Sequence, residues 1–202
     1  MFRKPPSPPK LSTGTRDTRS RLTRQPGLGL TEAPGSAVSW EKVPGTAALN
    51  QGGLAEVFSV SCASAGNCSA GGYYTENSAR TRYQASVVSQ INGTWHTAIE
   101  VPGTAALNIS RLAKVLSVSC ASAGNCTAGG FYTNSSGYQA FVVSQVNGTW
   151  RTAIEVPGTA ALNSGGNAAI ASVSCASAGN CSAGGDYTDS SGNNQAFVVS
   201  KS

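Results

Sequence analysis

The decapeptide SVSCASAGNC occurs three times without change, at Ser59–Cys68, Ser117–Cys126 and Ser172–Cys181. It is the centre of a longer repeat, because VPGTAALN precedes each copy and a Gly-Gly pair follows each one. Successive copies lie 58 and 55 residues apart. A repeat of this length is typical of propeller blades rather than of helical solenoids. The chain is therefore expected to consist of three copies of one supersecondary unit.

Each copy divides into four short stretches that are typical of β-strands. In the middle copy these stretches are residues 113–122, 125–133, 138–145 and 149–157. Asn147–Gly148, between the third and fourth stretches, supplies the positive φ angles of a type I′ hairpin turn. The sequence therefore predicts an all-β fold of tandem four-stranded antiparallel units that resemble propeller blades, in three copies of about 55 residues.

The first predicted strand of each unit carries an alternating pattern. In EVFSVSC, strict alternation puts Phe58, Val60 and Cys62 on one face of the strand and Val57 on the other. The FVVS stretches, in contrast, are apolar at successive positions, which is typical of strands that are covered on both faces. We therefore expect the small sheets to stack side by side.

The repeat domain is expected over residues 37–202, with copies at about 44–98, 99–153 and 154–202. It begins with a lone strand at 37–43, which is expected to pair with Gln195–Ser200 because the third copy lacks its fourth strand. Three blades are fewer than the four to eight of closed propellers. Two interpretations stay open: a homodimer that completes a six-bladed ring, or a fragment of a longer array.

Residues 1–36 differ from the repeats in composition. Met1–Leu30 holds seven of the 14 Lys and Arg and one acidic residue, whereas the other residues carry a net charge of −1. This segment has too few apolar side chains to form a core, so we predict a disordered, basic, Pro- and Arg-rich tail over 1–36. Nucleic-acid binding by the tail is not expected, because no aromatic side chain is interleaved with its arginines. No secretory signal is visible in it, and no membrane-spanning helix is predicted.

The six cysteines form three pairs, each with five intervening residues. We interpret each pair as a disulfide across its own hairpin, where the two Cα atoms would lie about 5.5 Å apart. The predicted disulfides are Cys62–Cys68, Cys120–Cys126 and Cys175–Cys181. Free buried thiols and a metal site are the alternatives, although zinc sites have closer spacing and His96 is the only histidine. Disulfides persist in oxidising compartments, so an extracellular or cell-surface location is predicted, with a reduced cytoplasmic protein as the alternative.

The segment GGFYTNSSGYQAFVVSQVNGTW of the middle copy resembles the core of a kelch repeat. Both have a Gly-Gly doublet that closes the second strand, then an aromatic residue, then a Trp that opens the fourth strand. The matching residues are Gly129, Gly130 and Trp150, with Gly71, Gly72 and Trp95 in the first copy and Gly184 and Gly185 in the third. The NGTW hairpin is also similar to the sialidase-type Asp-box, although the aspartate of that box is absent. Over 37–202, the SCxSxxxC motif and the Gly-rich strand that follows it resemble uncharacterised bacterial propeller-like repeat proteins.

This resemblance implies a propeller-like fold and leaves the function open. Kelch proteins are mostly binding scaffolds, but some are oxidases, and some sialidase-like propellers are hydrolases. A glycosidase needs two carboxylates that converge on one bond, whereas Glu100 and Glu155 occupy equivalent positions in successive units and are not expected to converge. We therefore predict no catalytic residue, no metal site and no cofactor.

Aromatic residues that recur once per unit are the candidate binding residues. They are Tyr74, Trp95, Tyr132, Trp150 and Tyr187. Such residues line the sugar sites of repeat lectins, but a Trp after a hairpin more often packs on its own sheet. The sequence thus predicts a non-enzymatic repeat scaffold or binding module with a glycan or a protein as its ligand. The alternative is a fragment of a propeller-type carbohydrate-active enzyme whose catalytic blades are missing.

Overall fold

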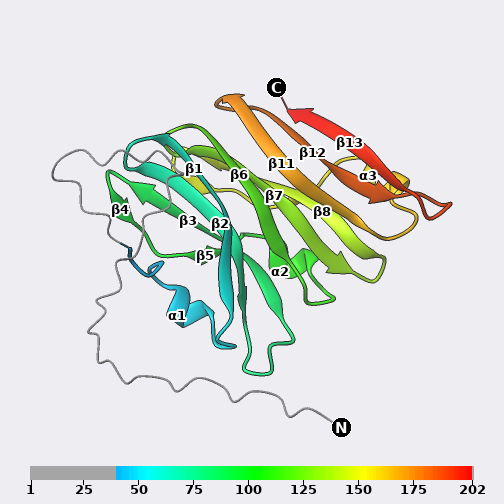
Figure 1. Ribbon diagram of the computed structural model, residues 1–202, viewed down its shortest axis with the longest axis horizontal. Coiled ribbons are helices and arrows are strands. Elements are labelled where there is room, and N and C mark those ends of the chain that lie inside the picture. Colours follow the sequence, from blue (N-terminus) through cyan, green and yellow to red (C-terminus); the bar gives the residue numbers. More distant parts are fainter. Residues whose placement is uncertain (1–39, 202) are drawn as a thin grey trace, which may run out of the picture. The chain divides into compact units, whose positions relative to one another are not determined.

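Three antiparallel sheets, one from each repeat, build the part of the chain that the structure describes, residues 40–201 (Figure 1). The structure is a computed structural model. The predicted all-β fold of tandem antiparallel units is confirmed. The tail predicted over residues 1–36 lies outside the described residues, as does the first part of the predicted lone strand.

The three long strands of each repeat pair in chain order, and the short strands that follow in units 1 and 2 pair with the third long strand, so every unit is a local meander. Unit 1 contains β1 (Ala55–Ser64), β2 (Asn67–Thr75), β3 (Tyr83–Ile91), β4 (Thr94–Trp95) and β5 (Ile99–Glu100). Unit 2 contains β6 (Lys114–Ser122), β7 (Asn125–Asn134), β8 (Gly137–Val146), β9 (Thr149–Trp150) and β10 (Ile154–Glu155). Unit 3 contains β11 (Ala168–Ser177), β12 (Asn180–Thr188) and β13 (Asn194–Lys201).

The predicted Asn-Gly hairpin turns are confirmed. Asn147 and Gly148 have φ angles of 50° and 81°, and Asn92 and Gly93 have φ angles of 48° and 85°. These positive values match the twist that a two-residue turn must have between antiparallel strands. The turns fix the register of the third and fourth strands in units 1 and 2.

The fourth strand differs from the prediction, because it is broken into two pieces of two residues. In unit 2 both β9 and β10 pair with β8, and Arg151–Ala153 lie between them without strand structure. The backbone N–H of Ala153 turns out of the ladder and donates to the carbonyl oxygen of Pro102 at 2.7 Å. The chain therefore leaves the sheet edge at this point and returns to it at Ile154.

A one-turn helix that was not predicted forms in each VPGTAALN segment. The helices are α1 (Thr46–Leu49), α2 (Thr104–Leu107) and α3 (Thr159–Leu162). Each begins after a glycine in the left-handed conformation, such as Gly103 with a φ of 86°. The Thr104 hydroxyl donates to the carbonyl oxygen of Val101 at 2.6 Å, so this turn is closed by its own first side chain.

A β-bulge interrupts the alternation of the first strand in every unit. In unit 1 the register with β2 shifts between Val57 and Ser59. The bulge brings Val57 and Val60 to the same face, so the strict alternation predicted for this strand is wrong at Val57. The second glycine of the Gly-Gly pair makes room for the bulge, because a Cβ atom on Gly72 would overlap the carbonyl oxygen of Glu56.

The three sheets pack face to face in chain order. We call the side of a unit that faces the preceding unit its front face, and the opposite side its back face. The largest core cluster combines Val115, Val118 and Phe141 from the front face of unit 2 with Ala85 and Val87 from the back face of unit 1. A second cluster joins unit 2 to unit 3 in the same way. Most of the core therefore lies between units, and the predicted side-by-side stacking is confirmed.

The stack is open within the described residues. Trp40–Val43 form no strand, and residues 37–39 lie outside the described range. Among the described residues, β13 pairs with β12 alone. The predicted pairing of 37–43 with Gln195–Ser200 is thus absent from residues 40–43, and no closed propeller forms from the part of the chain that the structure describes.

Candidate functional site at the ends of the stack

The contact between consecutive units follows one pattern that occurs twice. The hydroxyls of Ser59 and Ser61 accept hydrogen bonds from the backbone N–H groups of Val118 and Cys120, at 2.9 and 3.0 Å. In the next contact, Ser117 accepts from Val173 and Ser119 accepts from Cys175, both at 3.0 Å. Side chains of one first strand thus satisfy the edge of the following first strand. The repeated SVSC sequence therefore supplies both halves of this contact: its serine hydroxyls accept, and the backbone N–H groups of its Val and Cys donate.

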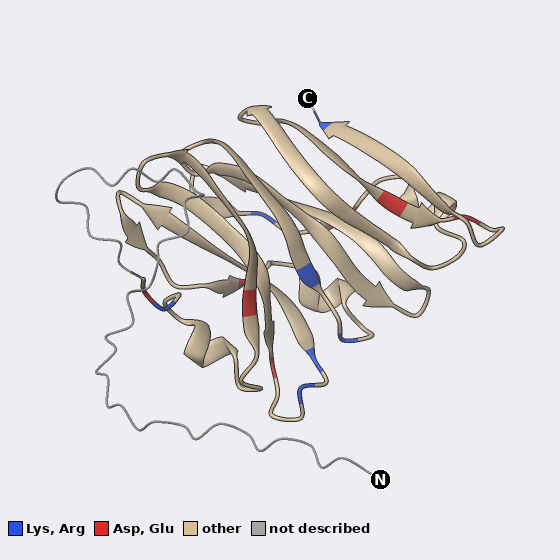
Figure 2. Ribbon diagram, viewed as in Figure 1, with Lys and Arg blue, Asp and Glu red and all other residues tan. Residues whose placement is uncertain are grey.

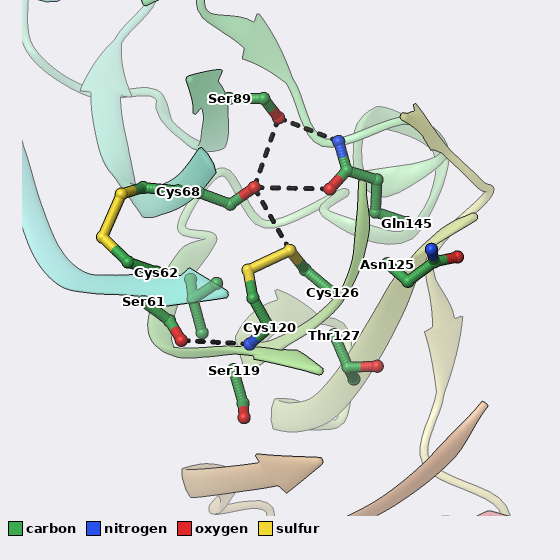
Figure 3. Close-up of a disulfide and its surroundings, with 12 residues drawn as sticks. Ser61, Cys62, Cys68, Ser89, Ser119, Cys120, Asn125, Cys126, Thr127 and Gln145 are labelled. Atoms are coloured by element: carbon green, nitrogen blue, oxygen red, sulfur yellow. Dashed lines mark hydrogen bonds between the residues drawn. A yellow bond between two sulfur atoms is a disulfide. The ribbon is translucent and has the colours of Figure 1, made fainter. Parts of the chain in front are cut away.

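The disulfide-bearing hairpins lie at the same contact (Figure 3). The predicted pairs Cys62–Cys68, Cys120–Cys126 and Cys175–Cys181 are all bonded. The Cα atoms of Cys62 and Cys68 are 3.9 Å apart, closer than predicted, because the two residues lie directly opposite each other in the ladder.

A buried hydrogen-bond network stands beside these disulfides. Ser69 is buried and donates to Oε1 of Gln145 at 3.3 Å, across the contact between units 1 and 2. Nε2 of the same Gln145 donates to the Ser89 hydroxyl at 2.9 Å (Figure 3). Nε1 of Trp150 donates to the same hydroxyl at 3.3 Å. Four side chains, from β2, β3, β8 and β9, therefore share one network across the contact.

The last residue of TAALN also bridges the units. Asn108 donates from Nδ2 to the carbonyl oxygen of Tyr83 and to Oε1 of Gln84, both at 2.9 Å. Asn163 repeats this arrangement one unit later. In unit 1, the counterpart Asn50 uses only Oδ1 in its hydrogen bonds to described residues, so its Nδ2 is left without the bridge.

Close packing at each contact depends on the first glycine of the Gly-Gly pair. A Cβ atom on Gly71 would overlap the side chain of Val115, and one on Gly129 would lie 2.6 Å from Cγ2 of Ile170. Only glycine allows the next unit to approach this closely. The aliphatic side chain of one front face thus inserts over the glycine of the preceding back face.

The two ends of the stack carry the unmatched halves of this contact. On the front face of unit 1, Val57 and Val60 are 45% and 56% exposed, whereas their counterparts Val115 and Val118 are 0% and 6% exposed. On the back face of unit 3, Val198 is 86% exposed. Exposed aliphatic side chains gathered on one face are typical of interaction surfaces.

The front face of unit 1 is also hollowed. A groove of about 530 Å³ lies there, and its lining includes Val43, Val57, Ala70, Ser86 and Val88. Ser86 stands where unit 2 has the fully buried Phe141, so a large side chain is replaced by a small one at the floor of this groove. The front face can therefore receive side chains that a flat sheet would exclude.

A second groove, of about 400 Å³, lies between units 2 and 3 beside β13. Its lining includes Ser144, Ile154, Ala183 and Val199. Ser144 is the counterpart of Ser89, which binds the indole of Trp150 in the preceding contact. This groove therefore corresponds to the space that the fourth strand fills in unit 2.

The five predicted binding residues are distributed over the three units and are not brought together on one surface. Tyr74, Tyr132 and Trp150 are buried, while Trp95 packs on the cluster of Ala70, Val88 and Ala98, and Tyr187 packs near Phe197. The side-chain contacts of these rings favour the packing interpretation over stacking on a sugar.

Two of the tyrosines hold the glutamates that the sequence singled out. The hydroxyl of Tyr132 donates to Glu155 at 2.7 Å, and that of Tyr74 donates to Glu100 at 3.0 Å. Burial, with the neighbouring glutamate as a further cause, raises the pKa of both tyrosines far above its usual value. Each glutamate is thus tied to its own unit, and the pair does not converge on a common point.

Charged side chains are few and dispersed over residues 40–201 (Figure 2). Lys114 of unit 2 makes a cation–π contact with unit 1, since its Nζ lies 4.2 Å from the ring centroid of Tyr73. Within residues 40–201, no group of three or more His, Cys, Asp and Glu side chains is gathered as a metal site would need. No helix among these residues is long and apolar enough to cross a membrane.

Neither protein-family models nor curated proteins match this chain. The resemblance to kelch repeats therefore stays a prediction.

Sequence reasoning missed the end-face residues Val57, Val60, Gly184 and Val198. The sequence did contain a signal, which is the place of these residues in the first and last repeats. Each of these repeats has a neighbouring repeat on one side only among the described residues.

Proposed function

We propose that this chain is a non-enzymatic binding scaffold of the extracellular space and that its ligand is a protein. The observation that carries the proposal is the front face of unit 1, where Val57 and Val60 lie exposed beside an apolar groove. The same positions are buried by a neighbouring sheet in units 2 and 3. A surface that is built to be covered by protein elsewhere in the chain is suited to bind protein here.

The three disulfides support the extracellular part of the proposal, because such bonds persist in oxidising compartments. A thiol-trapping experiment tests it. Cultures are quenched with acid, and the protein is treated with a polyethylene-glycol maleimide before and after reduction. We expect none of the six cysteines to react before reduction and all six to react after it. Reaction of all cysteines before reduction would contradict an oxidising location.

Selection from a random peptide library tests the protein ligand. The library is displayed on phage and selected against the oxidised full-length chain. We expect enriched apolar peptides that lose their binding to the double variant V57D/V60D, since the charges would occupy the apolar face. The matched control is I109D, because Ile109 is 64% exposed and its counterparts are the polar Gln51 and Ser164.

Two results would contradict the proposed ligand. One is a selection in which no peptide is enriched, or in which the enriched peptides bind V57D/V60D as well as the wild type. The other is specific binding to a glycan array by the wild type and by V57D/V60D alike, which would indicate a sugar ligand at another surface.

A further inference from the structure

We infer that the protein partner is a second copy of this chain, whose unit 1 docks with its front face on the back face of unit 3. This inference rests on the proposed function and names the partner. The contact would repeat the one that joins units 1 and 2 and units 2 and 3. Because the two faces differ, the contact is heterologous, and it closes into a ring or continues as an open chain of copies.

The apolar parts of the two faces are complementary by position. Val57 is the counterpart of Val115 and Ile170, which insert over Gly71 and Gly129. Gly184 is the third glycine of this series, and the nearest atom to a Cβ built on it is the carbonyl oxygen of Phe197 at 3.6 Å. The space over Gly184 is therefore open, and Val57 of a second copy has the shape to fill it.

Val60 and Val198 complete the apolar match. Val118, the counterpart of Val60, lies in one core cluster with Val87, the counterpart of Val198. Val60 and Val198 are 56% and 86% exposed in the single chain. Docking would bury both side chains, and burial of apolar surface is the main favourable term in association.

The polar parts match as well. Ser172 and Ser174 are the counterparts of Ser59 and Ser61, and their side chains make no hydrogen bond to any residue among 40–201. The N–H groups of Val60 and Cys62 are the counterparts of the donors that such serines bind in the two internal contacts. Two hydrogen bonds would therefore form between the copies along the first strands.

One pair of charges opposes the docking. In the contact between units 1 and 2, Lys114 lies over the ring of Tyr73. The counterparts of these residues at the two ends are the exposed Glu56 and the half-buried Asp186. Docking brings these two carboxylates close together, and like charges at an interface weaken it. The substitution E56K would turn the repulsion into an attraction.

The molar mass of the oxidised full-length chain in solution tests the inference. It is measured by sedimentation velocity over a wide range of concentrations, starting from the 20.4 kDa of one chain. We expect the mass to rise with concentration for the wild type and for the control I109D. E56K is expected to associate at about two- to fivefold lower concentration than the wild type, since one rim repulsion becomes an ion pair.

Two variants that each block one face make the test specific. V60D places a charge on the front face, and G184L fills the space on the back face, where the nearest atom of unit 3 to a Cβ on residue 184 is 3.6 Å away. We expect each variant alone to remain a monomer. A mixture of the two is expected to form a species of two chains, because V60D keeps its back face and G184L keeps its front face. Formation of the mixed species also shows that both variants are folded.

Three results would overturn the inference: a wild type that stays at 20.4 kDa at every concentration, association of V60D or G184L alone to the same extent as the wild type, or a mixture that stays monomeric. The peptide selection distinguishes this failure from that of the proposed function. Peptides that bind the front face of a chain that does not self-associate would leave the protein-binding function standing with a different partner.

Discussion

The identical SVSC sequence places the same valine at three equivalent positions, two covered and one exposed, and this gives an internally controlled stability series. Val118 and Val173 are 6% and 8% exposed, because a preceding unit covers them, whereas Val60 is 56% exposed. The variants V60A, V118A and V173A make the same chemical change in the same local sequence. Differences among them therefore report the cover that each neighbouring unit provides.

The expected magnitudes follow from burial. Replacing Val by Ala removes two carbon groups, and each buried group contributes about 0.8 kcal/mol to stability. With a residual cavity, V118A and V173A should each lower the free energy of unfolding by about 2 kcal/mol. V60A loses about half of that contact and leaves no cavity, so its effect should stay below about 1 kcal/mol.

Urea denaturation of the oxidised chain, followed by tryptophan fluorescence and circular dichroism, measures these differences. The protein is kept at a concentration where sedimentation shows single chains, because docking of a second copy would bury Val60. Equal losses for V60A and V118A in the monomer would refute the assignment of Val60 to an uncovered face. A loss for V60A that grows with protein concentration would instead report the docked copy.

Three further predictions concern the contact, the disulfides and the tyrosines. G129A should lower the free energy of unfolding by about 1–3 kcal/mol, since its Cβ would lie 2.6 Å from a neighbouring isoleucine, whereas G184A should change it by less than about 0.5 kcal/mol; urea denaturation compares the two. Replacing both Cys120 and Cys126 by Ala should lower the free energy of unfolding by about 2 kcal/mol, because the cross-link restricts the unfolded chain. Folding and unfolding rates measured in urea test this account. A change in the unfolding rate alone would contradict it. Above about pH 10, tyrosines ionise in the unfolded chain, whereas Tyr132 stays protonated in the folded chain because its pKa is raised. The contribution of Tyr132 to the free energy of unfolding is therefore complete below about pH 10 and is lost as the pH rises further. Stability measured from pH 8 to 12 should therefore fall less steeply for Y132F, and equal slopes would count against the raised pKa.

The features that were predictable from the sequence are local ones. The hairpin at Asn147 follows from the positive φ angles that Asn-Gly tolerates, and the disulfide from Cys120 to Cys126 follows from their spacing across one turn. The first three strands of each unit follow from short stretches and their turn residues in the same way. None of these inferences requires knowledge of a neighbouring unit.

The features that were missed depend on contacts between distant segments. Alternation failed at Val57 because a bulge folds the backbone over Gly72, and this glycine lies in the partner strand rather than in the bulged one. The fourth strand is interrupted where the N–H of Ala153 donates to the carbonyl oxygen of Pro102, which lies about fifty residues earlier in the sequence. The candidate site was missed for the same reason, since the role of Val60 becomes visible only when Val118 is seen beneath a neighbouring sheet.

The serine ladder along the first strands has a consequence for how such a gene can change in length. Each SVSC segment carries both the acceptors for the next unit and the donors for the previous one. A copy inserted by unequal recombination therefore carries the hydrogen-bonding groups for both of its neighbours, and no compensating substitution is needed. The gene can therefore gain or lose whole units while the contact between neighbouring units stays the same.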